Sequence, residues 1–219
     1  ISHTIALRND GTLWAWGDNS KGQLGNGTNI DQSNPIQIGS GYASIASGWN
    51  QSFAIKTNGT LWAWGFNGNG QLGDGTTMQK NSPTNISNSQ TWVAIEAGSS
   101  FGYAIRSDNS LWSWGFNGYG QLGDGTLTQR NSPTKVGVDT NWVTISAADG
   151  TVNNGLIFGH HAFGLKNNSD ELCWIGANYI GQGGNGTLVN KKKNAGVSVF
   201  LNQRKREAYD HNNDNYSEL

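Results

Sequence analysis

Several stretches of this sequence could carry chemistry, and each is better explained by turn formation. The glycine-rich segment GQLGDGT (70–76) lacks the lysine and serine or threonine ending, and the following helix, that a phosphate-binding loop requires. Asn67, Asn69 and Asp74 carry oxygen ligands of the kind calcium prefers, but no bidentate glutamate stands at the necessary position. Asn, Asp and Gly are the residues that tight turns select, so we expect these positions to shape turns.

The histidines and the single cysteine also favour structural roles. His160 and His161 are adjacent, but no cysteine or carboxylate stands near them at ligand spacing. Cys173 aligns with Trp62 of another copy of the repeat described below, which predicts a small buried apolar side chain rather than a nucleophile. No Ser-His-Asp or paired-carboxylate set stands out. The sequence therefore predicts a non-enzyme, with no catalytic residues, no metal and no cofactor.

The chain is organised around one repeated motif. LWAWGFNGNGQLGDGT occupies residues 61–76, and close copies occupy residues 13–28 and 111–126. A degraded copy, LCWIGANYIGQGGNGT, occupies residues 172–187, and Pro35, Pro83 and Pro133 keep the same period. A period near fifty residues indicates repeated supersecondary units, most often a solenoid or a propeller.

Each unit is predicted to contain short antiparallel strands. The apolar run 51–55 and the motif start 61–65 flank Asn58-Gly59, the pair that most strongly signals a hairpin. A third strand fits residues 93–97, matched by 42–47 and 143–147. Side chains alternate along a strand, so Trp62 and Trp64 share one face and Leu61 and Ala63 share the other. Because both faces are apolar, we predict sheets packed on both sides by similar sheets.

Here the motif resembles a known family. The pattern of a short apolar strand followed by LWAWG-x-N-x-x-GQLG-D/N-GT is similar to the repeats of the regulator of chromosome condensation family, over about residues 1–190. The resemblance implies a β-propeller, usually of seven blades, that works by binding proteins. The sequences of these copies look most like those of bacterial members of the family, including the secreted β-lactamase-inhibiting propeller.

The predicted fold is therefore all-β, a β-propeller of about four tandem repeats of roughly fifty residues. Residues 1–201 are predicted to form the repeats, and residues 202–219 a disordered or short helical tail. The first repeat starts without its third strand, and residues 197–201 (VSVFL) are a candidate to replace it and clasp the first blade. Self-closure into a small ring is one alternative. The other is part of a larger propeller, with the possibility that two half-rings pair as a homodimer.

Composition limits the partners. The formal net charge is −1 and charged residues are only 13% of the chain, against about 25% in typical domains, which argues against nucleic-acid binding. No apolar run reaches the ~18 residues of a membrane span, so no membrane insertion is expected. The chain begins with Ile, which predicts a cleaved or truncated N-terminus. An extracellular or cell-surface location is favoured.

The variable loop positions are the candidate partner-binding residues. Loops after each copy of the motif should share one face of the ring, and repeat proteins vary recognition positions while keeping scaffold positions alike. The alternative for Phe66 and Phe116, and equally for Tyr119 and Trp49, is that they only cover the blade edge. The insertion 149–160 is either a tolerated loop or a contact element. The predicted binding face comprises Trp49, Phe66, Phe101, Phe116, Tyr119, Lys80 and Arg130.

Three functions are compatible with this sequence. The first is a non-enzymatic scaffold that binds another protein through one face. The second is a guanine-nucleotide exchange factor for a small GTPase, the activity that the resemblance implies for the family's namesake. The third is an inhibitor of a secreted enzyme such as a β-lactamase, which loop aromatics would plug.

Overall fold

The structure is a computed structural model, and it describes residues 3–86, 89–148, 151–153, 156–158, 160–167, 172–177, 189 and 191–197. Within these residues the chain forms antiparallel strands and no helix. The first sheet has three strands in the order β1 (His3–Leu7), β2 (Leu13–Gly17) and β3 (Gln32–Gly39). The prediction of an all-β fold is confirmed.

Three four-stranded sheets follow. The second runs β4 (Tyr42–Ser47), β5 (Gln51–Lys56), β6 (Leu61–Gly65) and β7 (Lys80–Asn85). The third runs β8 (Trp92–Ala97), β9 (Phe101–Arg106), β10 (Leu111–Gly115) and β11 (Arg130–Lys135). The fourth runs β12 (Trp142–Ala147), β15 (His161–Lys166), β16 (Leu172–Gly176) and β17 (Lys191–Val197). A separate hairpin of β13 (Thr151–Asn153) and β14 (Leu156–Phe158) lies between β12 and β15.

The predicted hairpins form as the turn residues require. β5 pairs with β6 from Gln51 opposite Gly65 to Ile55 opposite Leu61. Gly59 takes a φ of +78°, and the side chain of Asn58 accepts a hydrogen bond from the backbone N–H of Thr60 at 3.1 Å. Left-handed backbone is easily reached by glycine, so the turn and the register that follows from it are set locally.

The outer strands were not predicted. The periodic prolines Pro35, Pro83 and Pro133 lie inside β3, β7 and β11 rather than in loops. Proline cannot donate a hydrogen bond to a neighbouring strand, and it is tolerated on an edge strand whose N–H faces outward. Each of these strands is the outer edge of its sheet. The prolines therefore mark the end of each sheet, where they also discourage further strand addition.

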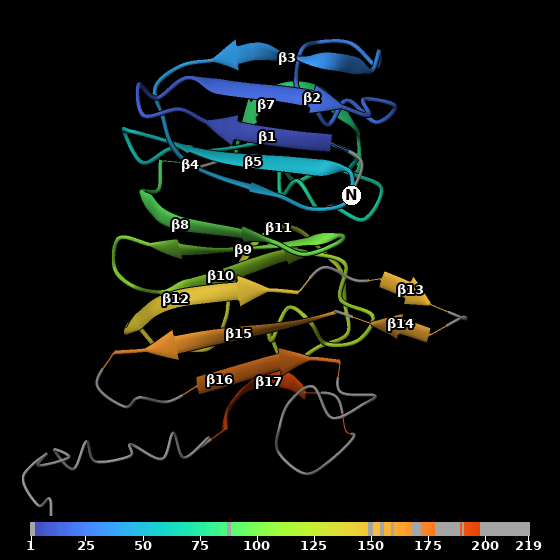
Figure 1. Ribbon diagram of the computed structural model, residues 1–219. Helices are drawn as coiled ribbons and strands as arrows, with labels where there is room; N and C mark the ends of the chain where they lie inside the picture. The colour runs from blue at the N-terminus through green and yellow to red at the C-terminus, as the bar shows by residue number, and fades with distance from the viewer. Residues whose placement is uncertain are drawn as a thin grey trace, which may run out of the picture.

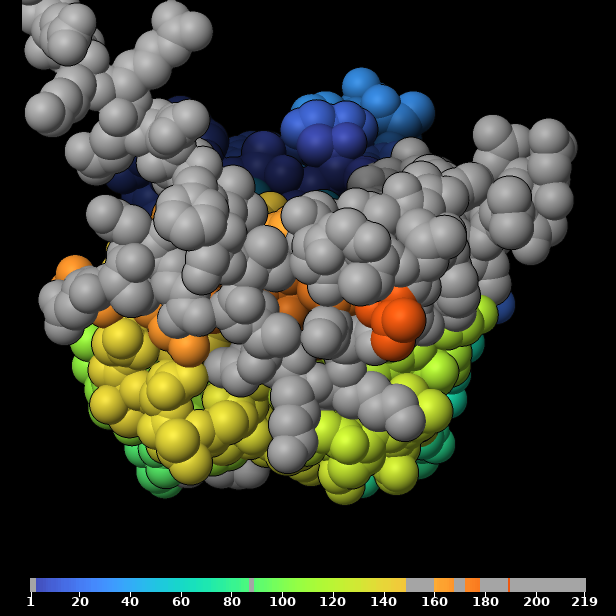
Figure 2. Space-filling model, turned by 90° about the horizontal axis from the view of Figure 1, so that it is seen from below, coloured from blue at the N-terminus to red at the C-terminus, as the bar shows by residue number. Residues whose placement is uncertain are grey.

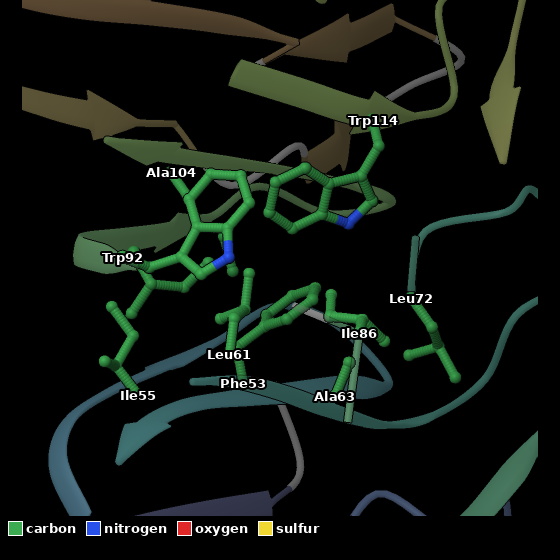
Figure 3. Packing of buried hydrophobic residues seen from close by; sticks show 11 residues of the cluster. Phe53, Ile55, Leu61, Ala63, Leu72, Ile86, Trp92, Ala104 and Trp114 are labelled. Atoms are coloured by element: carbon green, nitrogen blue, oxygen red, sulfur yellow. The ribbon is translucent and has the colours of Figure 1, made fainter. Parts of the chain in front are cut away.

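The sheets stack face to face through their tryptophans, as predicted. Figure 3 shows Trp92 and Trp114 of the third sheet pointing toward Phe53 and Leu61 of the second. The ring of Trp114 meets the edge of Phe53, with 5.8 Å between ring centroids. Phe53, Leu61 and Trp114 are all fully buried. Burial of both sheet faces explains why the repeat motif has no polar face.

The described sheets form an open stack. Substantial contacts join β1 to β4, β4 and β5 to β8, and β8 and β9 to β12, which all belong to sheets that are consecutive in sequence. The first and fourth sheets lie at opposite ends of the stack (Figure 1). Viewed from the fourth sheet's end, blue residues of the first sheet are seen mainly along the upper rim, and yellow and yellow-green residues lie at the opposite side of the view (Figure 2).

The clasp predicted for residues 197–201 is wrong where the structure describes it. Val197 ends β17 and pairs with Leu172 of β16, so it completes the fourth sheet rather than the first. Residues 198–201 and the predicted tail 202–219 lie outside the described residues. β17 is the outer strand of the fourth sheet, as β7 and β11 are of theirs. In each sheet the outer strand directly follows its neighbour in the sequence.

The degraded fourth copy still has a buried interior. Cys173 has no exposed surface, as predicted for a small apolar residue in the tryptophan position. Trp174, at the position that Ala63 occupies in the second sheet, is also fully buried. Gly123 of the third sheet's loop lies against Ile175, where its counterpart Gly73 lies against Trp114. The fourth sheet therefore packs against the third at the same position, through the smaller side chain of Ile175.

Candidate functional site

The predicted partner-binding residues gather at one end of the sheets. Phe66 follows β6 and Phe116 follows β10, while Lys80 and Arg130 begin the outer strands opposite Gly65 and Gly115. In Figure 1 these strand ends lie on the right, where the β13–β14 hairpin also projects. The shared strand direction of the repeats therefore brings the variable loops to one surface, which we name the loop face.

A buried asparagine fixes each loop of this face. In the second sheet, Asn67 is fully buried, and its carbonyl oxygen accepts the Leu72 N–H at 3.0 Å. Its amide nitrogen donates to Asp74 Oδ1 at 3.0 Å and to the carbonyl oxygens of Thr76 and Met78, each at 3.1 Å. Asn19 and Asn117 make the corresponding contacts in the neighbouring repeats. These residues therefore shape turns, as predicted, because one buried asparagine holds together the loop that runs from Asn67 to Met78.

Each loop is also tied to the following sheet. The indole N–H of Trp64 donates to the backbone carbonyl of Gln23 at 2.9 Å, and Trp114 donates to Gln71 at 2.9 Å. Gly25 and Gly73 lie so close to these indoles that an added Cβ would stand within 2.7 Å of Trp64 and 2.8 Å of Trp114. A hydrogen bond from the N–H of a buried indole fixes the orientation of the ring. The loop face is therefore a rigid surface anchored in the joints between sheets.

Three aromatic rings meet at the loop face in a group that we name the aromatic cluster: Phe116, Tyr119 and the buried His160. His160 stacks on Tyr119 with centroids 5.2 Å apart and planes 23° apart, and its ring centroid lies 5.9 Å from Phe116. Phe116 and Tyr119 meet edge to face at 5.9 Å. Phe116 and Tyr119 are half-buried, so the rings both cover the sheet end and present apolar surface to solvent.

His160 is the residue that sequence reasoning missed. It ends the insertion 149–160, and its backbone carbonyl accepts from Ala177 N–H at 2.8 Å, as Ser100 accepts from Phe116 at 2.9 Å. That equivalence places His160 at a strand entrance, where Asn50 and Ser100 stand in the other sheets. An alignment of the repeats that starts from the first residue of β15, with the insertion placed before that strand, would have put His160 in line with Asn50 and Ser100.

The second aromatic position is paired differently. Phe66 is half-buried, and the ammonium of Lys21 lies 5.9 Å from the centroid of its ring. Cation–π contacts extend to about 6 Å from the ring centroid, so a cation at this distance and at an exposed site gains only modest energy. Trp49 is 38% exposed, which makes it the only tryptophan among the large exposed apolar residues of the described chain. Trp49 and Phe66 therefore extend the apolar surface of the loop face toward the first sheets.

Phe101 does not belong to this surface. The sequence placed it in a loop, but it begins β9, and its side chain is fully buried. It contacts Tyr103 edge to face at 6.0 Å and lies 6.5 Å from His160. A partner cannot touch a side chain with no exposed area, so we remove Phe101 from the candidate residues and assign it to the core beneath the aromatic cluster.

Lys80 and Arg130 are held within their own loops. Lys80 Nζ lies 3.3 Å from Asp74 Oδ2, and Arg130 Nε lies 2.7 Å from Asp124 Oδ2. Burial by itself would raise the pKa of the Asp124 carboxyl, but hydrogen bonds from Thr126 and Arg130 outweigh it and leave the pKa below its usual range. Both cations remain about one third exposed or less, so they stabilise the loops and can contribute only part of their surface to a partner.

We expect acid to destabilise the aromatic cluster through His160. Burial, together with the neighbouring His161, lowers the pKa of His160 from its ordinary 6.5 to about 4. Because the unfolded chain binds this proton more readily, stability is full above pH 6.5 and falls as the pH drops from 6.5 to 4. Thermal melts between pH 7 and 4 should show this fall, and His160→Phe should show a smaller one. An equal fall in both proteins would contradict this assignment.

The described residues contain no group of three His, Cys, Asp or Glu side chains placed to hold a metal ion. Among these residues no helix is long and apolar enough to cross a membrane. The site as described is thus a rigid, partly aromatic surface built from repeated loops, with Lys80 and Arg130 paired to aspartates beside the rings. Its chemistry suits apolar contact and hydrogen bonding.

Comparison with known proteins agrees with this geometry. The Regulator of chromosome condensation (RCC1) repeat model matches residues 10–55, 58–105 and 108–152, and a second model of that repeat matches 42–71 and 92–121. A 36-residue stretch is 53% identical to the Ultraviolet-B receptor UVR8 of Arabidopsis thaliana and covers 16% of this chain and 8% of that protein.

Solved structures share the fold over most of the chain. The crystal structure of human WBSCR16 matches with a TM-score of 0.75 and 21% identity, over 90% of this chain and 51% of that one. Prp20p from Saccharomyces cerevisiae matches with a TM-score of 0.76 and 20% identity, over 91% of this chain and 49% of that one.

The chain thus spans about half the length of the solved structures it matches and a small part of the plant receptor. These relatives come from human, yeast and plant, so the expectation of a bacterial type of repeat finds no support in them. The matched repeats lie within residues 10–152 and cover more than half of the chain, from β2 of the first sheet to β12 of the fourth. The chain belongs to the family of proteins built from regulator of chromosome condensation repeats, and its sheets are blades of that family's β-propeller.

Proposed function

We propose that this chain is a non-enzymatic scaffold that binds another protein through the loop face. The observation that carries the proposal is the rigid row of partly exposed rings, from Trp49 and Phe66 to Phe116 and Tyr119, on loops locked by buried asparagines. Rigid aromatic side chains lose little conformational entropy on binding, and they are enriched among the residues that dominate interface energies. Repeats that differ mainly at such positions are typical of recognition surfaces.

The proposal extends to the boundaries of the unit and to its setting. We place the propeller repeats in residues 1–201, and the binding residues in the loops at the carboxyl ends of β6 and β10 and in the loop between β4 and β5, which carries Trp49. Lys80 and Arg130 act as the rim of the surface, because their ion pairs hold them beside the rings. An extracellular or cell-surface setting fits the low charge of the chain.

Truncation of two rings tests the proposal. We expect the double variant Trp49→Ala/Tyr119→Ala to fold normally and to bind each protein captured by the wild type at least about tenfold more weakly, because each ring supplies partly exposed apolar area. The matched control is Val93→Ala/Val143→Ala, which removes exposed apolar groups from β8 and β12. Quantitative capture with both variants measures the difference. Equal recovery of every partner by the ring variant would defeat the assignment.

An exchange factor is the second candidate function. The structure of Prp20p was described together with binding to Gsp1p and histones, and yeast RCC1 (Prp20) was also crystallised with Kap60. These partners are proteins, which agrees with a binding role for this fold. Release of labelled nucleotide from a panel of small GTPases separates the candidates, since a scaffold leaves the rate unchanged. The third candidate, inhibition of a secreted enzyme, is separated by assaying β-lactamase activity in the presence of the chain.

A further inference from the structure

Three equivalent loops of the loop face differ in charge at two positions. In the second sheet Asp74, within GDGT, pairs with Lys80, the first residue of the outer strand β7, and the third sheet has the same kind of pair. In the first sheet the motif reads GNGT, with Asn26, and the outer strand β3 begins with Gln32. The first loop therefore forms without an ion pair at these positions.

The loop closes in the same way with or without the charges. Asn26 Oδ1 accepts hydrogen bonds from the buried asparagine of its loop and from the N–H two residues on, each at 3.0 Å. Asp74 Oδ1 accepts the same two bonds at 3.0 and 2.9 Å. The other carboxylate oxygen of Asp74, Oδ2, faces Lys80 Nζ at 3.3 Å. Loop closure therefore does not require the charges, which leaves them open to another use.

Each ion pair is arranged with the acid beneath the cation. The side chains of Asp74 and Asp124 are 7% and 3% exposed, whereas those of Lys80 and Arg130 are 29% and 34% exposed. No other carboxylate occurs between the loop phenylalanine and the cation in either loop. The charge that these two loops present to solvent is therefore positive, although each loop as a whole is neutral.

Both cations keep hydrogen-bond donors for a further carboxylate. Lys80 has three N–H donors, and its contact with Asp74 is 3.3 Å long. Arg130 donates from Nε to Asp124 at 2.7 Å, and its Nη2 lies 3.5 Å from the Thr126 hydroxyl. A guanidinium carries five donors in a fixed fork, so the exposed part of Arg130 can donate to a second acceptor.

Exposed aliphatic side chains lie close in sequence to both cations. Met78 is 68% exposed and stands two residues before Lys80, and Leu127 is 48% exposed and stands three residues before Arg130. The Met78 carbonyl accepts a hydrogen bond from the buried Asn67 amide at 3.1 Å, so the backbone that carries this side chain is fixed. Each loop thus presents an aliphatic side chain and a cation on one rigid support, and the arrangement occurs twice, one repeat apart.

We propose that the loops of the second and third sheets bind a segment of a partner protein that carries both carboxylates and aliphatic side chains. Its carboxylates contact Lys80 and Arg130, and its aliphatic side chains lie on Met78 and Leu127. This inference rests on the proposed function and names the chemistry of the partner. Complementary charge across an interface sets specificity and association rate. A nucleic acid would also attract cations through its phosphates, but its backbone offers no contact to the exposed aliphatic side chains.

Exchange of both charged pairs for the neutral pair of the first loop tests the proposal. The quadruple variant Asp74→Asn/Lys80→Gln/Asp124→Asn/Arg130→Gln keeps the net charge of the protein, because each loop loses one charge of each sign. We expect its melting temperature to stay within about 3 °C of the wild type, since the first loop already closes with asparagine and glutamine. The variant therefore removes the outward cations from a folded protein.

Binding is measured by fluorescence anisotropy at low salt with a labelled peptide that repeats Glu-Leu-Glu-Gly. We expect the wild type to bind it at least about tenfold more tightly than a peptide that repeats Lys-Leu-Lys-Gly, and the quadruple variant to bind the two alike. No preference in the wild type, or an undiminished preference in the variant, would overturn the proposal. Equally tight binding of an oligonucleotide of the same charge would show an unselective cationic surface and also contradict it.

The first loop supplies the reverse test. Asn26→Asp/Gln32→Lys installs an ion pair there without a change in net charge, and we expect it to raise the affinity for the glutamate peptide about twofold. Lys135→Gln is the control, because this exposed cation ends the strand that Arg130 begins and lies away from the loop face. An equal loss of affinity in Lys135→Gln and in Asp124→Asn/Arg130→Gln would show a response to overall charge rather than to the site.

The inference and the function on which it rests fail differently. If Trp49→Ala/Tyr119→Ala loses captured partners and the quadruple variant keeps them all, the scaffold function stands and the acidic partner is overturned. If the ring variant recovers every partner, the binding face itself is defeated. The peptide measurements then still decide whether Lys80 and Arg130 select carboxylates.

Discussion

Replacement of Trp64 with alanine is expected to lower the free energy of unfolding by about 3–5 kcal/mol. The indole is fully buried between the first and second sheets, and its N–H bonds to the Gln23 carbonyl at 2.9 Å. Gly25 lies directly against the ring, and bulk there would be strained because its φ is +77°. Truncation would leave a cavity in the joint that a rigid loop cannot close, and it would remove one of the two hydrogen bonds that the Gln23 carbonyl accepts, the other coming from the Ser52 hydroxyl at 2.8 Å.

Chemical denaturation measures this loss, and the neighbouring Trp62 is the matched control. Trp62 is half-buried, with the Lys56 ammonium 4.2 Å from its ring and its N–H bonded to the Thr60 hydroxyl at 2.9 Å. Trp62→Ala removes the same number of atoms from a site open to solvent, so it should cost about 1–2 kcal/mol. Equal losses for the two variants would argue against sheets joined through the second tryptophan of each motif.

Asn67→Ala is expected to cost about 3 kcal/mol, because one truncation leaves several buried backbone groups without partners. The Asn67 amide joins the start of its loop to Leu72, Asp74, Thr76 and Met78. The Leu72 N–H loses a buried partner, while the groups of Asp74, Thr76 and Met78 are part-buried. We also expect faster proteolysis within residues 70–79, since the loop would lose the contacts that order it.

Asn69→Ala is the control for this prediction. Asn69 lies in the same loop and is half-buried, and its own contact is a backbone N–H that donates to Gln71 Oε1 at 2.8 Å. Because alanine keeps that N–H, the change should stay within about 0.5 kcal/mol. A large loss of unfolding free energy at Asn69 together with a small loss at Asn67 would show that the buried Asn67 amide does not hold the loop together.

Much of the fold could be predicted because its causes are local. Asn58-Gly59 sets a hairpin, alternation sets the faces of Trp64 and Leu61, and the fifty-residue period sets the number of sheets. Even Cys173 was predictable, since alignment with Trp62 places it in a sheet interior. The outer strands were missed because their prolines imitate loop signals. Only the position of a strand at the edge of its sheet makes proline acceptable there.

The site was harder to predict because exposure depends on distant neighbours. Phe101 and Phe116 look alike as loop aromatics, yet one starts a strand and is buried beneath the ring that the other presents. His160 joins the aromatic cluster across an insertion, so no spacing within a repeat reveals it. Lys80 and Arg130 were recognised as variable cations, but their aspartate partners six residues earlier show them to be partly structural.

The four described sheets form an open stack in sequence order, with the loop face along one side. Spin labels at the equivalent exposed hairpin positions Asn9, Thr57, Ser107 and Asn167 test it most directly. Distances from Asn9 should increase in the order Thr57, Ser107, Asn167, because each position lies one sheet further along the stack. A distance from Asn9 to Asn167 as short as that from Asn9 to Thr57 would show a closed ring of four sheets and rule out the open stack.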